Sequence, residues 1–102
     1  MAEEFSLYDT AEFLKTEKDM LLYLDACLED GDSTLMTHAL GVIARTYGMS
    51  QLARDTGISR EGLYRALSVN GNPEFATVMK VIKALGMKLH ASINQARIEA
   101  LP

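Results

Sequence analysis

Residues 50–67 are Ser-Gln-Leu-Ala-Arg-Asp-Thr-Gly-Ile-Ser-Arg-Glu-Gly-Leu-Tyr-Arg-Ala-Leu, and they match the steric pattern of a helix-turn-helix. Ala53 is small where two helices would cross, and Gly57 follows where the chain must turn through a conformation that few other residues tolerate. Ser50 and Ser59 stand at the expected helix starts, where a hydroxyl accepts a hydrogen bond from an unpaired backbone N–H. The seam between the two helices would be formed by Leu52, Ile58, Leu63 and Ala66.

Four long polar side chains remain on one face of the second helix once its core positions are set aside: Arg60, Glu61, Tyr64 and Arg65. Any two amphipathic helices joined at a glycine would share the apolar pattern, but they would not require this face. In a helix-turn-helix the second helix enters the major groove of DNA, where an arginine can donate two hydrogen bonds to a guanine. Double-stranded DNA is therefore the first partner that the sequence suggests.

Two of these four residues have a structural alternative. Glu61 could accept a hydrogen bond from cytosine, or it could be an acidic residue favoured by the dipole at a helix start. Tyr64 could touch a thymine methyl group or a phosphate, or it could pack half-buried against the protein. Three residues near the helix starts would hold phosphates and position the protein rather than specify sequence, namely Ser50, Gln51 and Ser59.

Gly62 lies inside the second helix, where glycine costs about 1 kcal/mol relative to alanine. A close approach should compensate for this cost. Either another helix packs tightly against Gly62 or the DNA does, and the sequence leaves both possibilities open.

The chain has 102 residues, of which 48% are apolar, enough for one domain with a core that needs neither disulfides nor metals. No run of about 18 apolar residues could span a bilayer, and the acidic start Met-Ala-Glu-Glu-Phe is unlike a secretory signal. We therefore expect a cytoplasmic protein without a membrane partner. The single cysteine, Cys27, lies in an apolar stretch and is expected to be buried and inert.

Charge is distributed unevenly along the chain, although the net charge is −4. Residues 1–32 hold ten acidic residues against two lysines, whereas residues 33–102 hold eight basic residues against four acidic ones. DNA affinity depends on a local basic patch, so an acidic protein is not excluded from binding DNA. The acidic segment could face a basic partner or be a solvated helical surface.

Helical periodicity continues outside the central stretch. A short helix is expected at about 9–14, a second at about 17–30 capped by Thr16, and a third from Asp32 or Ser33 to about Tyr47. The third helix would bury Met36, Ala39, Leu40, Ile43 and Tyr47. Asn72-Pro73 would start a last helix at about 73–85, with Lys80 and Lys83 pointing outward. That helix would pack across the central pair through Phe75, Val78, Met79, Ile82 and Leu85.

Residues 87–93 alternate apolar and polar side chains with period two, which is typical of a strand with one buried face. A lone strand needs a partner, and the same strand of a second molecule is the preferred one, with a plain extended tail as the alternative. We thus expect a single domain over 1–102, with an acidic extension at 1–32, a helix-turn-helix core at 33–86 and this strand at 87–93.

The sequence contains no clear motif for catalysis or metal binding. The two histidines, His38 and His90, have no Cys, Asp or Glu at metal-ligand spacing. His38 with Asp25 and Glu29 could be drawn as an acid–base group, but no nucleophile or phosphate-binding loop accompanies them. We expect no enzyme activity, no metal and no cofactor.

The chain over about residues 8–93 resembles the Xre/Cro-type regulators, and within them the probable addiction-module antidotes, or HigA-like antitoxins. The resemblance is carried by four stretches: 23–32, 39–45, 48–68 and 71–86. It implies an all-α, lambda-repressor-like helical bundle with an N-terminal helical extension and a short C-terminal strand. It also implies a dimeric antitoxin of a type II toxin–antitoxin pair, which represses its own operon and neutralises a small basic ribonuclease-like toxin.

Because one recognition helix contacts few base pairs, we expect a homodimer on a pseudo-palindromic operator in the protein's own promoter, with half-sites about 34 Å apart. The basic toxin could pair with the acidic residues Asp25, Glu29, Asp30 and Asp32. The alternatives are a protein-interaction module and a toxin-independent transcriptional regulator on the same helical scaffold.

Overall fold

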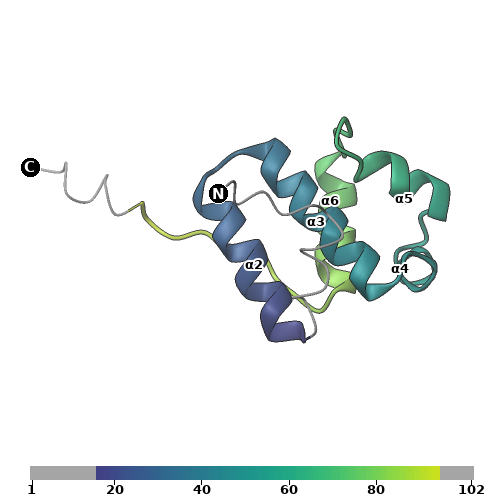
Figure 1. The fold of residues 1–102 in the computed structure, drawn as a ribbon, viewed down its shortest axis with the longest axis horizontal. Coiled ribbons are helices and arrows are strands. Elements are labelled where there is room, and N and C mark those ends of the chain that lie inside the picture. The colour runs from purple at the N-terminus through teal and green to yellow at the C-terminus, as the bar shows by residue number, and fades with distance from the viewer. Residues whose placement is uncertain (1–15, 95–102) are drawn as a thin grey trace, which may run out of the picture.

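The computed structural model describes residues 16–94, and these residues form five helices and no strand. The helices are α2 (Glu17–Glu29), α3 (Ser33–Tyr47), α4 (Met49–Thr56), α5 (Arg60–Ala66) and α6 (Phe75–Ala84). The expected all-α class is confirmed for this part of the chain, and the helix expected at 9–14 lies outside the described residues. In Figure 1, α3 runs through the middle, α2 lies on one side of it, and α4 and α5 lie on the other.

The first two helices begin at side-chain caps, as the sequence predicts. The Thr16 hydroxyl accepts a hydrogen bond of 3.0 Å from the backbone N–H of Asp19 at the start of α2. The Asp32 carboxylate accepts bonds of 2.8 and 3.3 Å from two backbone N–H groups in the first turn of α3. Between the helices the chain turns at Gly31, whose φ of 69° is a left-handed conformation that favours glycine.

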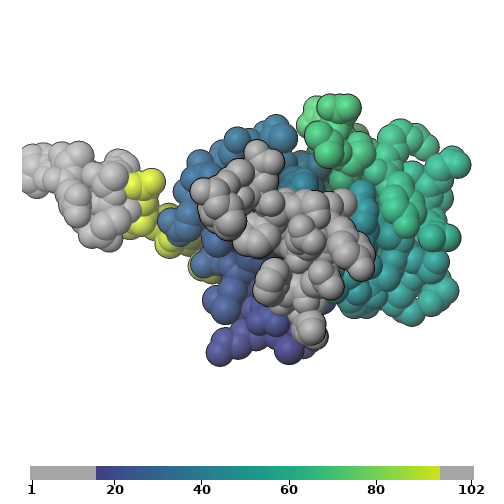
Figure 2. All heavy atoms as spheres, viewed as in Figure 1, coloured from purple at the N-terminus to yellow at the C-terminus, as the bar shows by residue number. Residues whose placement is uncertain are grey.

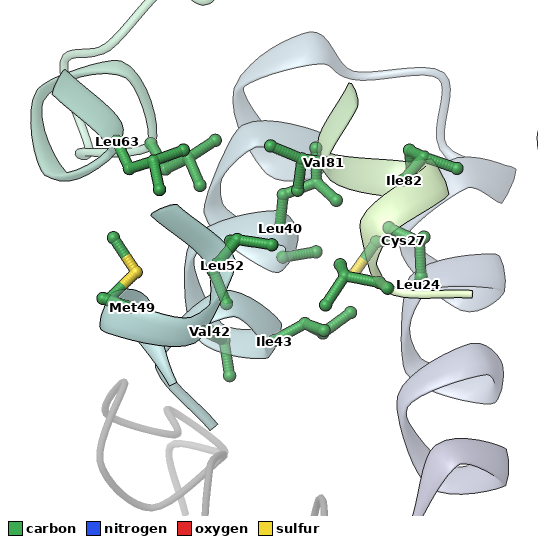
Figure 3. Packing of buried hydrophobic residues seen from close by; sticks show 14 residues of the cluster. Leu24, Cys27, Leu40, Val42, Ile43, Met49, Leu52, Leu63, Val81 and Ile82 are labelled. Atoms are coloured by element: carbon green, nitrogen blue, oxygen red, sulfur yellow. The ribbon is translucent and has the colours of Figure 1, made fainter. Parts of the chain in front are cut away.

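The core is centred on α3, whose residues 39–44 are all buried. Figure 3 shows side chains of α2, α4, α5 and α6 converging on this helix. Helix α2 contributes Leu24 and Cys27, so it belongs to the same packed unit as the other helices. The core is formed by Leu24, Cys27, Ala39, Leu40, Val42, Ile43, Ala44, Met49, Leu52, Leu63, Leu67, Val81, Ile82 and Leu85.

The buried stripe of α3 differs from the predicted one at its end. Ala39, Leu40 and Ile43 are buried as expected, but Tyr47 is 38% exposed and lies outside the core. A central helix has neighbours on several sides, which explains why Gly41 and Val42 are buried as well.

Helix α4 starts two residues earlier than predicted, and Ser50 is not its cap. Gly48, with φ of 117°, occupies the cap position without a side-chain hydrogen bond, and its carbonyl accepts the Leu52 N–H at 2.9 Å. The prediction for Ser50 was wrong because this helix start is formed by backbone conformation alone. At the other end Gly57 adopts the expected left-handed conformation, with φ of 77°.

The predicted seam between α4 and α5 is present. Leu52 and Leu63 are completely buried, and Ile58 packs partly buried against the core. The link Gly57-Ile58-Ser59 joins the two helices, and α4 also contacts α6.

Helix α6 differs from the prediction in its start and in its buried face. It begins at Phe75 after Glu74, so Asn72-Pro73 precede the helix without capping it. Val81, Ile82 and Leu85 are buried, whereas Phe75 is 72% and Met79 is 40% exposed. At 100° per residue, the buried residues share one side and Met79 falls beside it. Lys80 and Lys83 are exposed, as expected.

After α6 the chain turns at Gly86 and continues without helix or strand through residue 94. Met87 and Leu89 pack partly buried against the core. A strand needs a neighbouring strand, so the pairing of residues 87–93 with a second copy stays a prediction. Within residues 16–94, no helix combines the length and the apolar character needed to cross a bilayer.

Candidate nucleic-acid interface

The outward face of α5 carries the four side chains that the sequence singled out. Arg60, Glu61, Tyr64 and Arg65 are all exposed, while Leu63 on the opposite side is buried in the core. Burial of Leu63 and packing on α4 therefore hold α5 with its polar face outward. Figure 1 shows α5 at the edge of the molecule, where another molecule can approach it.

The first turn of α5 is fixed by Ser59, whose hydroxyl accepts the Gly62 N–H at 3.0 Å. This confirms Ser59 as a cap, and it also explains the glycine inside a seven-residue helix. A Cβ at position 62 would lie 3.0 Å from the Ser59 hydroxyl and 3.5 Å from a methyl group of Ile58. Within the described residues, the atoms closest to this position thus belong to the cap and the link before α5 and not to another helix, and a close approach of DNA stays a prediction.

Glu61 lies one turn before Arg65, and the two charged groups are 3.9 Å apart. Both side chains are strongly exposed, so the pair contributes little to stability. Its effect is to hold an acidic group beside one of the two arginines of the face.

Tyr64 lies between two arginines. The guanidinium carbon of Arg60 is 5.6 Å from the centre of the Tyr64 ring, and that of Arg45 is 5.8 Å from it. Both distances lie within the range of cation–π attraction. Tyr64 is 39% exposed, so part of it is covered within the protein and part faces solvent, and its contact with DNA stays a prediction.

Arg45 is the residue of this cluster that sequence reasoning missed. It lies in the last turn of α3, outside the helix pair, and is exposed. Arg45 and Tyr64 lie on different helices, so the periodicity of neither helix could predict their contact.

At the start of α4 both Ser50 and Gln51 are exposed. The Gln51 amide nitrogen donates to Asp55 at 2.8 Å, and its oxygen accepts from Arg54 at 2.8 Å. Both ends of the Gln51 side chain are thus bound within α4, which the sequence did not indicate.

Asp55 accepts a further hydrogen bond of 2.8 Å from the hydroxyl of Tyr47. This bond, followed by the one from Gln51, lowers the pKa of Asp55 below its ordinary value. The same bond raises the pKa of Tyr47, because it stabilises the protonated phenol. The pair joins the last residue of α3 to the last turn of α4.

The four acidic residues proposed for toxin contact are all exposed, on α2 and the turn that follows it. Asp25 and Glu29 are one turn apart and line a shallow hollow together with Leu21, Leu28 and Met87. Asp32 is already engaged as the cap of α3. Helix α2 lies across α3 from α4 and α5, so this acidic surface is separate from the arginine cluster (Figure 1).

Other reactive groups offer no competing site in the described part of the chain. Cys27 is buried as expected, and burial raises the pKa of its thiol. Among residues 16–94, no group of three or more His, Cys, Asp or Glu side chains could hold a metal ion. Figure 2 shows atoms of the α4–α5 end at the surface on the side in view.

Comparison with known proteins identifies one matching family and one similar protein. The family described as "Probable addiction module antidote protein" matches residues 4–93. A protein of Haemophilus influenzae, described as uncharacterized, is 52% identical over 97 residues, which cover 95% of this chain and 98% of the relative. No solved structure matches the chain at a significant level.

Proposed function

The chain belongs to the family of probable addiction module antidote proteins, and on that premise we propose that it is a sequence-specific DNA-binding antitoxin. An antidote implies a cognate toxin as its partner. The finer proposal is that α4 and α5 act as a helix-turn-helix of the Xre type, as in HigA-like antitoxins.

One observation carries the DNA-binding proposal: Arg60 and Arg65 are exposed on a capped helix whose other side is fixed in the core. A rigid helix that presents arginines outward suits direct contact with base edges in the major groove. Glu61 and Tyr64 complete the face that would contact bases, while Ser50, Gln51 and Ser59 are proposed to position the DNA backbone.

Electrostatics supports the same face. Arg45, Arg54, Arg60 and Arg65 are all exposed on α3, α4 and α5, where the acidic residues are Asp55 and Glu61. Such a local excess of positive charge releases counterions from DNA although the whole chain is acidic.

The regulatory part of the proposal is repression of the protein's own operon by a homodimer on a pseudo-palindromic site. Seven residues of helix reach few base pairs, so a second copy supplies the remaining contacts. Pairing of residues 87–93 between two copies is the proposed contact.

The toxin is proposed to be a small basic ribonuclease-like protein that binds the acidic surface of α2. The hollow beside Asp25 and Glu29 combines these carboxylates with apolar side chains and is also lined by Lys88 and His90, and such a mixture of polar and apolar groups is common at protein interfaces. Deleting residues 1–32 would remove Leu24 and Cys27 from the core, so the acidic surface is better tested by point substitutions. Neutralising Asp25→Asn with Glu29→Gln keeps the fold and should weaken co-purification of the toxin, while Lys18→Ala, on the same helix, should not.

DNA binding is tested by fluorescence anisotropy on the promoter of the protein's own gene and on an unrelated duplex of equal length. Arg60→Ala and Arg65→Ala should each reduce the preference for the promoter by about tenfold, since a bidentate arginine–guanine contact is worth about 1–3 kcal/mol. Lys18→Ala on α2 removes one exposed positive charge away from α5 and serves as the control.

If neither arginine substitution changes promoter binding, the proposal fails in favour of a protein-interaction module. Retained binding and repression without any small basic protein encoded in the same operon would instead indicate a toxin-independent regulator.

A further inference from the structure

We propose that Arg45 of α3 is a third arginine of the DNA interface, where it contacts a backbone phosphate, and that Tyr64 is the positioning residue that holds it there. The inference rests on the proposed DNA-binding function and extends the interface beyond α4 and α5. It follows from three observations on the contacts of Tyr64, the space beside Arg45 and the charge of Arg45.

The first observation is the shared ring. Arg45 and Arg60 come from different helices, yet both guanidinium groups lie within 6 Å of the centre of the Tyr64 ring. Two like charges repel each other, and the attraction of both guanidinium groups to the electron-rich ring of Tyr64 offsets this repulsion. Tyr64 therefore couples the position of Arg45 to that of Arg60 on the proposed contact face.

The second observation is the space that Gly41 leaves open one turn before Arg45. A Cβ at position 41 would lie 2.7 Å from the backbone carbonyl of Leu67 and 2.9 Å from a terminal nitrogen of Arg45. Any larger residue would separate α3 from the end of α5 and displace the guanidinium. Gly41 thus allows both the close packing of these helices and the conformation of Arg45 that reaches Tyr64.

The third observation concerns the charge of Arg45. Arg45 is exposed and forms no ion pair with any residue of the described range 16–94. Contact with a ring engages the flat face of a guanidinium and leaves its N–H groups at the edge free for a phosphate. By contrast, Arg65 already has Glu61 beside it.

The position of Arg45 favours a phosphate over a base. In the proposed complex α5 occupies the groove, and Arg45 belongs to the neighbouring helix rather than to α5. Groups that flank a helix in the major groove meet the sugar–phosphate backbone, and such contacts add affinity without sequence preference.

The experiment measures affinity for the own-promoter duplex and for an unrelated duplex over a range of salt concentrations, using the full chain. Arg45→Ala should weaken binding to both duplexes equally, by roughly tenfold, the size of one charge-assisted hydrogen bond. It should also reduce the magnitude of the slope of log K against log salt by about 0.9, because one phosphate contact is lost. Lys18→Ala should leave the slope unchanged.

Tyr64 variants separate the positioning role from simple loss of charge. Tyr64→Leu removes the ring and should reproduce the loss of salt slope seen in Arg45→Ala. Tyr64→Phe keeps the ring and should keep the salt slope of the wild type, although it removes the hydroxyl from the proposed contact face. Arg45→Ala combined with Tyr64→Leu should lose little more than either alone. Without DNA, the NMR signals of the Tyr64 ring should shift in Arg45→Ala and stay in place in Lys18→Ala.

Each contrary result has a distinct meaning. A wild-type chain that binds neither duplex overturns the proposed function and this inference together. A wild-type chain that binds, with Arg45→Ala indistinguishable from it, overturns the inference alone. Loss of promoter preference without loss of affinity for the unrelated duplex would show that Arg45 contacts a base, against the phosphate role.

Discussion

Ser59 is the residue that stabilises the first turn of α5. Its hydroxyl satisfies one of the backbone N–H groups that the helix leaves unpaired, and a seven-residue helix has few other internal bonds. Ser50 has the same side chain and is also exposed near a helix start, but it caps nothing. The two serines therefore form a matched pair.

We predict that Ser59→Ala lowers the free energy of unfolding by roughly 1 kcal/mol, the usual value of a helix cap, and that Ser50→Ala changes it by less than about 0.5 kcal/mol. Urea unfolding followed by circular dichroism measures both. Equal effects of the two substitutions would show that the Ser59 bond does not stabilise α5.

The second prediction concerns Gly62. Glycine lowers helix propensity at this position, but it leaves room for the Ser59 hydroxyl that caps the helix. Alanine at position 62 would gain about 1 kcal/mol in helix propensity. Its Cβ would also crowd the Ser59 hydroxyl, 3.0 Å away, and weaken the cap. Gly62→Ala should therefore be nearly neutral in the wild type and should stabilise Ser59→Ala by about 1 kcal/mol.

A double-mutant cycle of unfolding free energies measures this coupling between positions 59 and 62. Strict additivity would mean that the glycine is present for a different reason, such as close approach of DNA.

At the scale of helices, the sequence predicted each start that rests on a side-chain hydrogen bond and missed those that rest on the backbone. Thr16, Asp32 and Ser59 cap their helices as expected. Gly48 and Glu74 precede α4 and α6 without any side-chain bond, so no capping side chain marks these starts in the sequence. Capping preferences describe side-chain chemistry, and they fail where the fold of the chain alone sets the start.

In the candidate site, too, the features that depend on local sequence were predicted and those that depend on helix packing were missed. The face of α5 follows from helical periodicity, which is a local property, and the four predicted side chains are exposed together. Arg45 and the exposed side of α6 depend instead on how helices pack against one another. Val78, Ile82 and Leu85 of the predicted α6 face pack on the core, but Phe75 at the start of the helix and Met79 at the edge of that face are exposed.

The angle between α3 and α4 is held in part by a hydrogen bond that spans the turn at Gly48. The Tyr47 hydroxyl donates to the carboxylate of Asp55 and lowers its pKa, with a further contribution from Gln51. A carboxyl group with a lowered pKa stabilises the folded state above its unfolded pKa of about 3.8. That contribution is lost as the pH falls through the folded-state value.

We predict that Tyr47→Phe raises the pKa of Asp55 toward its ordinary value and weakens the acid dependence of stability below about pH 4. The pKa of Tyr47 is raised, so this group stabilises the folded state below its unfolded pKa of 10.0. That stabilisation is lost as the pH rises above 10. Carboxyl carbon NMR titration of Asp55 measures the shift, with Tyr64→Phe as the control. An Asp55 titration that Tyr47→Phe leaves unchanged would contradict the hydrogen bond.

At the scale of the whole molecule, the arginine cluster and the acidic surface lie on opposite sides of α3. This separation has a consequence for an antitoxin, because DNA and toxin would contact different helices and need not exclude each other. Substitutions in one surface should then leave the other partner's binding intact, which makes the two proposed activities separable by mutation.

The last prediction concerns the second copy. Residues 87–93 leave the core with Met87 and Leu89 half-buried, while Lys88, His90 and residues 91–93 are exposed. The Met87 N–H already donates to the carbonyl of Ile82 at 3.0 Å, so we propose that the residues after it pair with the same segment of another chain. We expect a dimer at tens of micromolar, measured by analytical ultracentrifugation. Ala91→Pro should give a monomer, because proline removes a backbone donor, whereas Ala91→Thr should keep the dimer.

The same pair of variants links assembly to DNA binding. A monomer presents one α5, so Ala91→Pro should lose most of its affinity for the promoter while keeping its weak affinity for unrelated DNA. A dimer that persists in Ala91→Pro would place the contact elsewhere, and the exposed Phe75 and Met79 of α6 would then be the next residues to substitute. A wild-type chain that sediments as a monomer and still occupies its promoter as a single copy would refute the two-fold arrangement altogether.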